Sequence, residues 1–141
     1  MKKLLLLPIF IFTLIFSACH HDDQPNYYPG NSNLEGQWKL VNLSGGITGT
    51  SYDYPPGMIT WKFNGISQTV KVVNNNVDDN MQDLFPTGTY HFSFVNNEAT
   101  PELCAQTISI DGMNLGCYTI SDDEFMMNQT ETDGFMVRLI R

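Results

Sequence analysis

Four consecutive residues near the start of the chain, His20 to Asp23, carry side chains that bind metals, and Cys19 stands directly before them. Imidazole, carboxylate and thiolate groups are the usual ligands of zinc and other transition metals. Adjacent residues on a flexible segment cannot readily converge on one ion with a defined geometry. We therefore predict no metal site here and look for a different chemistry at Cys19.

The residues that precede Cys19 have the pattern of a secretory signal. Residues 1–3 form a positive start, Leu4 to Phe16 is a short and mostly apolar run, and Ser17-Ala18 supplies the small residues of a cleavage site. The run is shorter than the about 20 apolar residues that a membrane-spanning helix needs. We expect residues 1–18 to be removed.

Phe16-Ser17-Ala18-Cys19 resembles the lipobox of bacterial lipoproteins, in which the cysteine is acylated and becomes the first residue after cleavage. The resemblance implies that Cys19 carries acyl chains such as palmitate, which anchor the protein in the cell outer membrane. Buried acyl chains contribute about 0.8 kcal/mol per CH₂, so two or more would make the attachment essentially permanent. The alternative is an ordinary cleaved signal with a chance cysteine. Asp22-Asp23 resembles the acidic signal that sends some lipoproteins of Bacteroidota to the cell surface, and the periplasmic face is the other location.

Composition limits the class of partner. Without residues 1–18 the chain has 123 residues, enough for one domain, with five basic against fifteen acidic residues and a formal charge of −10. With so few basic residues, the sequence shows no Lys/Arg stripe that would displace the counterions of a nucleic acid, so we expect no nucleic-acid binding. Residues 19–33 are polar and rich in turn formers, as a flexible tether would be, and residues 34–141 form the domain.

Beyond the tether, apolar and polar residues alternate, which is typical of half-buried β-strands. No stretch has a convincing helical period. Dipeptides that suit tight hairpin turns separate the strands: Asn64-Gly65, Asp111-Gly112 and Asp133-Gly134. The first turn would pair Phe63 with Ile66. The eight predicted strands cover residues 36–43, 57–63, 66–73, 88–95, 106–111, 113–120, 124–132 and 135–141.

Neighbouring strands joined by short turns form an antiparallel meander. Closure of such a meander removes the two exposed edges that invite aggregation, so we predict an all-β, eight-stranded, up-and-down barrel. A barrel of this size is either filled by its own side chains or holds one small ligand.

Two cysteines, Cys104 and Cys117, are free to pair if the chain is exported. A disulfide between them would close a fourteen-residue loop and contribute about 3 kcal/mol. A two-residue turn at Asp111-Gly112 places them on one face but diagonally, about 7–8 Å apart, which is too far for an unstrained bridge without a bulge. Both states, bridged and free, remain open.

The opening of the domain, Gly36-Gln37-Trp38, resembles the Gly-x-Trp start of lipocalin and lipocalin-like barrels. Residues 34–141 as a whole resemble the small lipocalin-like lipoproteins of Bacteroidota through "LEGQWKLV", "PPGMITWKFNG", "GTYHFSF", "GCYTI" and "DGFMVRLIR". The resemblance implies that Trp38 closes one end of the barrel and that an arginine, Arg138 or Arg141, packs across its ring.

Aromatic residues in the apolar phase of their strands are predicted to point into the barrel. They either line a pocket for an apolar or ring-bearing ligand or fill the barrel as core. The segment from Ser44 to Gly57 would be a long loop, which either acts as a lid or contacts a partner, or is an ordered surface loop with no partner. The candidate ligand-binding residues are Trp61, Phe63, Tyr90, Phe92 and Phe94 inside the barrel, with Tyr52 and Tyr54 at the lid.

Two other groups of residues are candidates for a metal-binding or catalytic site, and neither matches a known motif. Asn76, Asp78 and Asn80 have the spacing of a calcium loop, but Met81 replaces the glycine of its sharp turn and the final glutamate is missing. His91 is the single histidine of the domain and has no nucleophile motif near it. We therefore expect no catalysis, no metal and no cofactor. The two hypotheses are a membrane-anchored binder of a small apolar ligand, and a non-catalytic interaction module whose protein partner the sequence does not identify.

Overall fold

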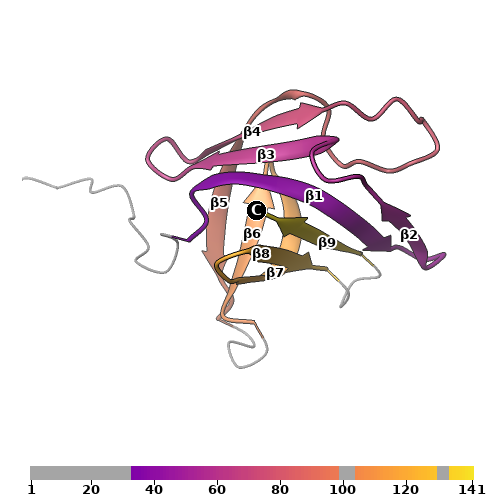
Figure 1. Cartoon of the computed structure of the whole chain (residues 1–141). Coiled ribbons are helices and arrows are strands. Elements are labelled where there is room, and N and C mark those ends of the chain that lie inside the picture. Colours follow the sequence, from indigo (N-terminus) through magenta and orange to yellow (C-terminus); the bar gives the residue numbers. More distant parts are fainter. Residues whose placement is uncertain (1–32, 99–103, 130–133) are drawn as a thin grey trace, which may run out of the picture.

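The computed structural model describes residues 33–98, 104–129 and 134–141, and the regular structure in these ranges is entirely β (Figure 1). All strand pairs are antiparallel. The described strands are β1 Gly36–Gly45, β2 Thr50–Asp53, β3 Ile59–Asn64, β4 Thr69–Asn74, β5 Gly88–Asn96, β6 Gln106–Ile110, β7 Met113–Ile120, β8 Glu124–Asn128 and β9 Phe135–Ile140.

The sheet closes on itself. Strands β3 to β9 follow one another in chain order, and β1 pairs with β3 on one side and with β9 on the other. The eight strands β1 and β3 to β9 therefore form an up-and-down barrel of the lipocalin-like type, which confirms the predicted fold class. The ninth strand, β2, pairs with β1 alone.

The segment from Ser44 to Gly57 is not the loop that was predicted, because it contains β2. The first part of β1 pairs with β3, and its last part pairs with β2, with Leu43 opposite Tyr52. The backbone N–H of Tyr54 extends this pairing by donating to Val41 C=O at 2.9 Å. A four-residue strand has too few alternating positions to be recognised in the sequence.

The predicted register of β3 and β4 is wrong. Phe63 lies opposite Val70 and not opposite Ile66, because the connecting turn has four residues, 65–68, in place of two. The side chain of Asn64 organises this longer turn, since its Oδ1 accepts hydrogen bonds from the backbone N–H groups of Ile66 and Ser67, both at 3.0 Å. The register differs from the predicted one by an even number of residues. The residues of β3 that were predicted to face the inside of the barrel therefore still do so.

The turn at Asp111-Gly112 has the predicted form. Ile110 pairs with Met113, and both turn residues have positive φ, 51° and 79°. Farther along this hairpin the register shifts by one residue at a β-bulge in β7 that includes Gly116. A Cβ at Gly116 would lie 2.1 Å from the C=O oxygen of Asn128 on β8, so this position requires glycine.

The predicted turn Asp133-Gly134 begins outside the described residues, as do residues 130–132 of the strand that was predicted to run to 132. Within the described part, β8 ends at Asn128, which pairs with Met136 of β9.

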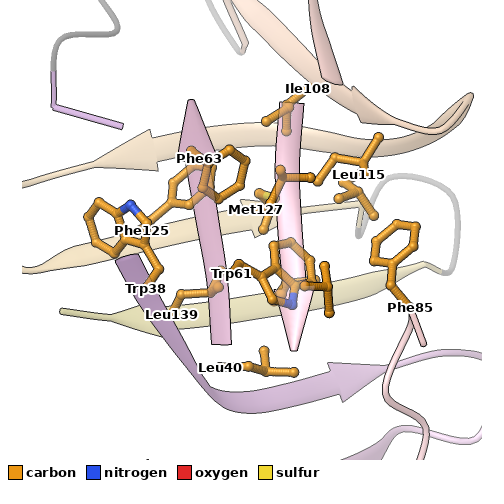
Figure 2. Packing of buried hydrophobic residues seen from close by; sticks show 14 of the residues in the cluster. Trp38, Leu40, Trp61, Phe63, Phe85, Ile108, Leu115, Phe125, Met127 and Leu139 are labelled. Atoms are coloured by element: carbon orange, nitrogen blue, oxygen red, sulfur yellow. The ribbon is translucent and has the colours of Figure 1, made fainter. Parts of the chain in front are cut away.

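The inside of the barrel is filled by its own side chains (Figure 2). Trp38 and Trp61 have no exposed surface, and Phe63 and Phe125 are exposed by at most 1%. Smaller residues from every barrel strand except β5 fill the space between the rings; among those fully enclosed are Leu40, Leu43, Ile59, Ile108, Ile110, Leu115, Met127 and Leu139. Packing of this kind supplies the main stabilising free energy of the fold.

Candidate functional site

The two ends of the barrel differ in construction. We call the end that carries residues 46–58 and 75–87 the loop end. The opposite end, where Asn33, the turn 65–68 and Arg141 lie, is here called the Arg141 end. Each end is closed by a different set of contacts, and these decide what the barrel can bind.

At the loop end the two long connections are joined to each other. The hydroxyl of Tyr54 donates a hydrogen bond to Gln82 C=O, across 28 residues of sequence. The second connection is held in turn by Asn74, whose Nδ2 donates to Asp83 Oδ2 at 2.8 Å and to Phe85 C=O at 3.0 Å. Of the alternatives for the segment Ser44 to Gly57, the structure therefore fits an ordered segment, which is bonded to the neighbouring connection.

Tyr54 is almost completely buried, with 3% of its surface exposed. Burial raises the pKa of its hydroxyl to about 12, and the nearby carboxylate of Asp83 and the Tyr52 hydroxyl add to the shift. The hydroxyl is thus a stable proton donor to Gln82 C=O over the whole physiological pH range.

Phe85 closes the barrel at the loop end. Its ring contacts Trp61 edge-on, with ring centroids 5.5 Å apart, and Tyr90 at 5.1 Å. Tyr90 is fixed by the hydrogen bond of its hydroxyl to Pro86 C=O at 2.9 Å. Sequence reasoning missed Phe85, although an apolar Leu84-Phe85 pair inside a polar, acidic stretch is a signal that the stretch returns to the core.

The structure brings the predicted ligand-binding residues together, but as packing partners. Phe63 contacts Trp61, Phe92 and Phe125 at centroid distances of 6.2, 5.3 and 5.8 Å. Phe92 in turn contacts Phe94 at 5.7 Å. These tilted and edge-to-face contacts are those of an aromatic core. The two lid residues, Tyr52 and Tyr54, also pack against this core.

Among the residues that the structure describes, one buried side-chain nitrogen has no hydrogen-bond partner. Nε1 of Trp61 is buried and makes no hydrogen bond to any described residue. A buried N–H without an acceptor costs about 1–3 kcal/mol, so such atoms in folded proteins call for an explanation. The indole lies directly beneath Phe85, at the loop end.

The Arg141 end is closed by Trp38. The guanidinium of Arg141 lies over its ring, with Cζ 4.5 Å from the centroid, and the indole Nε1 donates to Leu34 C=O at 2.8 Å. Arg141 also donates to the C=O groups of Asn33 and Glu35. This is the arrangement that the lipocalin-like resemblance implied, with Arg141 as the arginine.

The other predicted members of this closure have separate roles. Gly36 has φ of +115°, a conformation that L side chains rarely adopt, and a Cβ there would meet nothing within 4 Å. The glycine is therefore required by its backbone conformation and not by crowding. Arg138 does not contact Trp38: its Nε forms an ion pair with Glu124 Oε1 at 2.6 Å on the outside of β8 and β9.

A disulfide joins Cys104 and Cys117, with their Cα atoms 5.6 Å apart. Cys104 lies before the start of β6, outside the regular ladder, and this lets it approach Cys117. The bulge at Gly116 places Cys117 opposite Thr107, which by itself is one position farther from Cys104 along the strands. The sequence left the bridge open because a regular ladder would have kept the two cysteines apart.

A depression of about 460 Å³ lies beside the disulfide, between residues of β5, β6 and β7. Tyr118 is half-buried at its wall, and its hydroxyl donates to Gln106 Oε1 at 2.9 Å. Burial raises the pKa of this tyrosine. The residues that line the depression are Asn96, Cys104, Ala105, Gln106, Cys117, Tyr118 and Thr119.

The stretch with calcium-loop spacing is bonded within itself. Asp78 Oδ1 accepts hydrogen bonds from the backbone N–H and the side-chain amide of Asn80, and these bonds lower its pKa. Over residues 33–98, 104–129 and 134–141, no three His, Cys, Asp or Glu residues lie close enough to hold a metal ion. In the same ranges no helix has the length and apolar character to cross a membrane. The group Cys19 to Asp23 lies outside the described residues.

Comparison of the chain with protein-family models, with curated proteins and with solved structures finds no match. The class is therefore defined by the architecture: a closed, eight-stranded antiparallel β-barrel with one added strand.

Proposed function

We propose that this chain is a non-catalytic lipoprotein of the cell envelope, which is held on the outer membrane through Cys19 and binds a partner with the outside of its barrel. The observation that carries the second part is the filled interior: the two tryptophans and Phe63 are exposed by at most 1%, which leaves no space of ligand size around them. The lipobox-like Phe16-Ser17-Ala18-Cys19 and the likeness to lipocalin-like lipoproteins of Bacteroidota support the first part.

The loop end is the surface that best suits a protein partner. Ile47 and Val77 are 93% and 94% exposed, and solvent-facing aliphatic residues on ordered connections are typical of contact positions. The hydrogen bond between Tyr54 and Gln82 orders the two connections relative to each other, which lowers the entropy that a partner must remove on binding. Strand β2, which pairs on one side only, adds a free backbone edge to this end.

The anchor is tested by Cys19→Ala in the full chain. We expect the variant to lose acyl labelling and to leave the membrane fraction, because the thiol is the acylated group. Labelling and partitioning equal to those of the unmodified chain would rule the anchor out.

The loop end is tested with a photo-crosslinking residue placed at Ile47 or at Val77 in cells that make the protein. Ile66 is the matched control, since it is 91% exposed but lies at the Arg141 end. We expect one discrete crosslinked protein from the loop-end positions and none from Ile66. The same products from all three positions would mean that the loop end has no special role.

A second function, the binding of a small apolar ligand inside the barrel, is favoured by Trp61 alone, because its Nε1 lacks an acceptor. A ligand with a carbonyl or ether oxygen would supply one, after Phe85 moves aside. The test is native mass spectrometry of the full chain after exposure to a lipid and metabolite extract. Tyr54→Phe, which releases the two connections, should then increase the bound mass. A chain that carries nothing, with or without this substitution, excludes the ligand.

A further inference from the structure

The three lysines of the described chain lie on three neighbouring strands. Lys39 is on β1, Lys62 on β3 and Lys71 on β4, and these strands are adjacent in the sheet. The register sets Lys62 directly opposite Lys71, while Lys39 lies opposite Thr60 and hence diagonal to Lys62. Lys62 and Lys71 are exposed and Lys39 is half-buried. The outside of this part of the barrel is therefore basic, although the chain as a whole is acidic.

The strands that carry this surface have no carboxylate of their own, although Glu35 lies directly before β1 and Asp53 lies on β2 opposite Asn42. Strands β1, β3, β4 and β5 contain no Asp or Glu, and His91 on β5 lies opposite Thr69 at the next position along the sheet. No described carboxylate lies within ion-pair distance of any of the lysines, since the one pair formed in the described ranges joins Arg138 to Glu124. We call the surface made by Lys39, Lys62, Lys71 and His91 the lysine face.

Like charges directly opposite each other on antiparallel strands destabilise a sheet, because their side chains start only about 5 Å apart. Lys62 and Lys71 have this relation, and the fold supplies no carboxylate to offset their repulsion. An anion outside the chain would offset it, so the pair is better explained by binding than by folding.

We propose that the lysine face docks on the anionic phospholipid headgroups of the membrane to which the chain is attached. This inference rests on the anchoring proposed above. Thirteen residues lie between Cys19 and Asn33, so the connection between them reaches at most about 50 Å even when fully extended. The domain is thus kept close to the bilayer, and β1 with Lys39 starts three residues after Asn33.

Most of the acidic residues lie away from the lysine face. Asp78, Asp79 and Asp83 are at the loop end, and the carboxylate of Glu124 is paired with Arg138. Docking through the lysine face leaves the loop end and the strands β6 to β8 open to water, so a partner and the membrane can be bound together.

The test uses the full chain attached to preformed vesicles, of phosphatidylcholine alone or with added phosphatidylglycerol. A water-soluble acylating reagent labels the lysines, and mass spectrometry reads each site in the fraction that floats with the vesicles. We expect Lys39, Lys62 and Lys71 to be labelled about fivefold more slowly on the anionic vesicles than on phosphatidylcholine alone. Fivefold corresponds to the about 1 kcal/mol that one lysine gains at an anionic membrane surface. High salt screens this attraction and should restore the labelling rate. Equal labelling on both vesicles overturns the proposal. Protection by soluble heparin, without protection by vesicles, also overturns it and assigns the face to a polysaccharide.

Two variants separate the charge from the fold, with Lys39 as the readout. In the double variant Lys62→Gln, Lys71→Gln, the anionic vesicles should no longer protect Lys39 from labelling. Its thermal unfolding midpoint should stay equal or rise, because the repulsion between the two lysines is gone. In Lys62→Arg with Lys71→Arg, protection should persist. Protection that survives the glutamine changes refutes the lysine face. A failure of the anchor is distinguishable, because the chain would then not float with the vesicles at all.

Discussion

Replacement of Phe63 by alanine tests whether the barrel is filled or holds a cavity. Phe63 is 1% exposed and contacts three rings, those of Trp61, Phe92 and Phe125. Burial of a phenylalanine side chain contributes about 1.5–3 kcal/mol, and each ring contact adds about 0.5–1.5 kcal/mol. We therefore expect Phe63→Ala to lower the free energy of unfolding by about 3–5 kcal/mol, the usual range for such truncations in packed cores.

The measurement is urea unfolding followed by tryptophan fluorescence and circular dichroism, with the slope m compared between variants. Ile66→Ala is the control, because a side chain that is 91% exposed should contribute less than about 0.5 kcal/mol. Benzene should restore part of the stability of Phe63→Ala by filling the apolar space left by the ring. A loss below about 1 kcal/mol would refute the reasoning, since a ring that borders a solvent-filled cavity loses few contacts when it is removed.

Three further outcomes are expected. Cys104→Ser with Cys117→Ser should lower the free energy of unfolding by about 3 kcal/mol, as measured in urea, and reductant should have no effect on this variant. Tyr54 has a pKa of about 12 in the folded chain and about 10 in the unfolded chain. The free energy by which its protonated hydroxyl stabilises the fold is therefore complete below pH 10 and is lost as the pH rises to 12. Unfolding titrations should show a loss of about 1–2 kcal/mol over this interval, allowing for solvent near the rim, and Tyr54→Phe should lack it. Arg141→Ala should cost about 0.5–2 kcal/mol in thermal unfolding and Arg138→Ala less, because Arg141 stacks on a buried indole and Arg138 forms an exposed ion pair.

Period-two alternation was sufficient to predict the fold class, because an inward-facing residue every second position is what a closed antiparallel barrel requires. Turn chemistry was a weaker guide. Asp111-Gly112 forms the predicted two-residue turn, whereas at Asn64-Gly65 the asparagine side chain bonds to Ile66 and Ser67 and lengthens the turn. The two dipeptides look alike, and only the competing side-chain hydrogen bonds separate them.

The candidate site was predictable only in part. The contact of an arginine with Trp38 was predicted from a family resemblance. That the aromatic residues face the inside of the barrel was predicted from their spacing in the sequence. The bond between Tyr54 and Gln82 could not be predicted, because its acceptor is a backbone oxygen, which every residue carries. The lysine face depends on the register of β3 and β4, and the predicted register did not place Lys62 opposite Lys71.

The contact of Arg141 with Asn33 has a mechanical consequence. It closes the barrel at the end where the chain enters β1, and the loop end lies at the other end of the same strands. If the proposed anchor at residue 19 and a partner on the connection 75–87 pull against each other, the force enters through β1 and leaves through β4. Backbone hydrogen bonds are perpendicular to antiparallel strands, so this pull loads the bonds of β1 to β3 and to β9 in shear. Bonds loaded in shear share the force, whereas bonds pulled apart from one end break one after another, so the proposed attachments at the two ends would load the fold in its stronger direction.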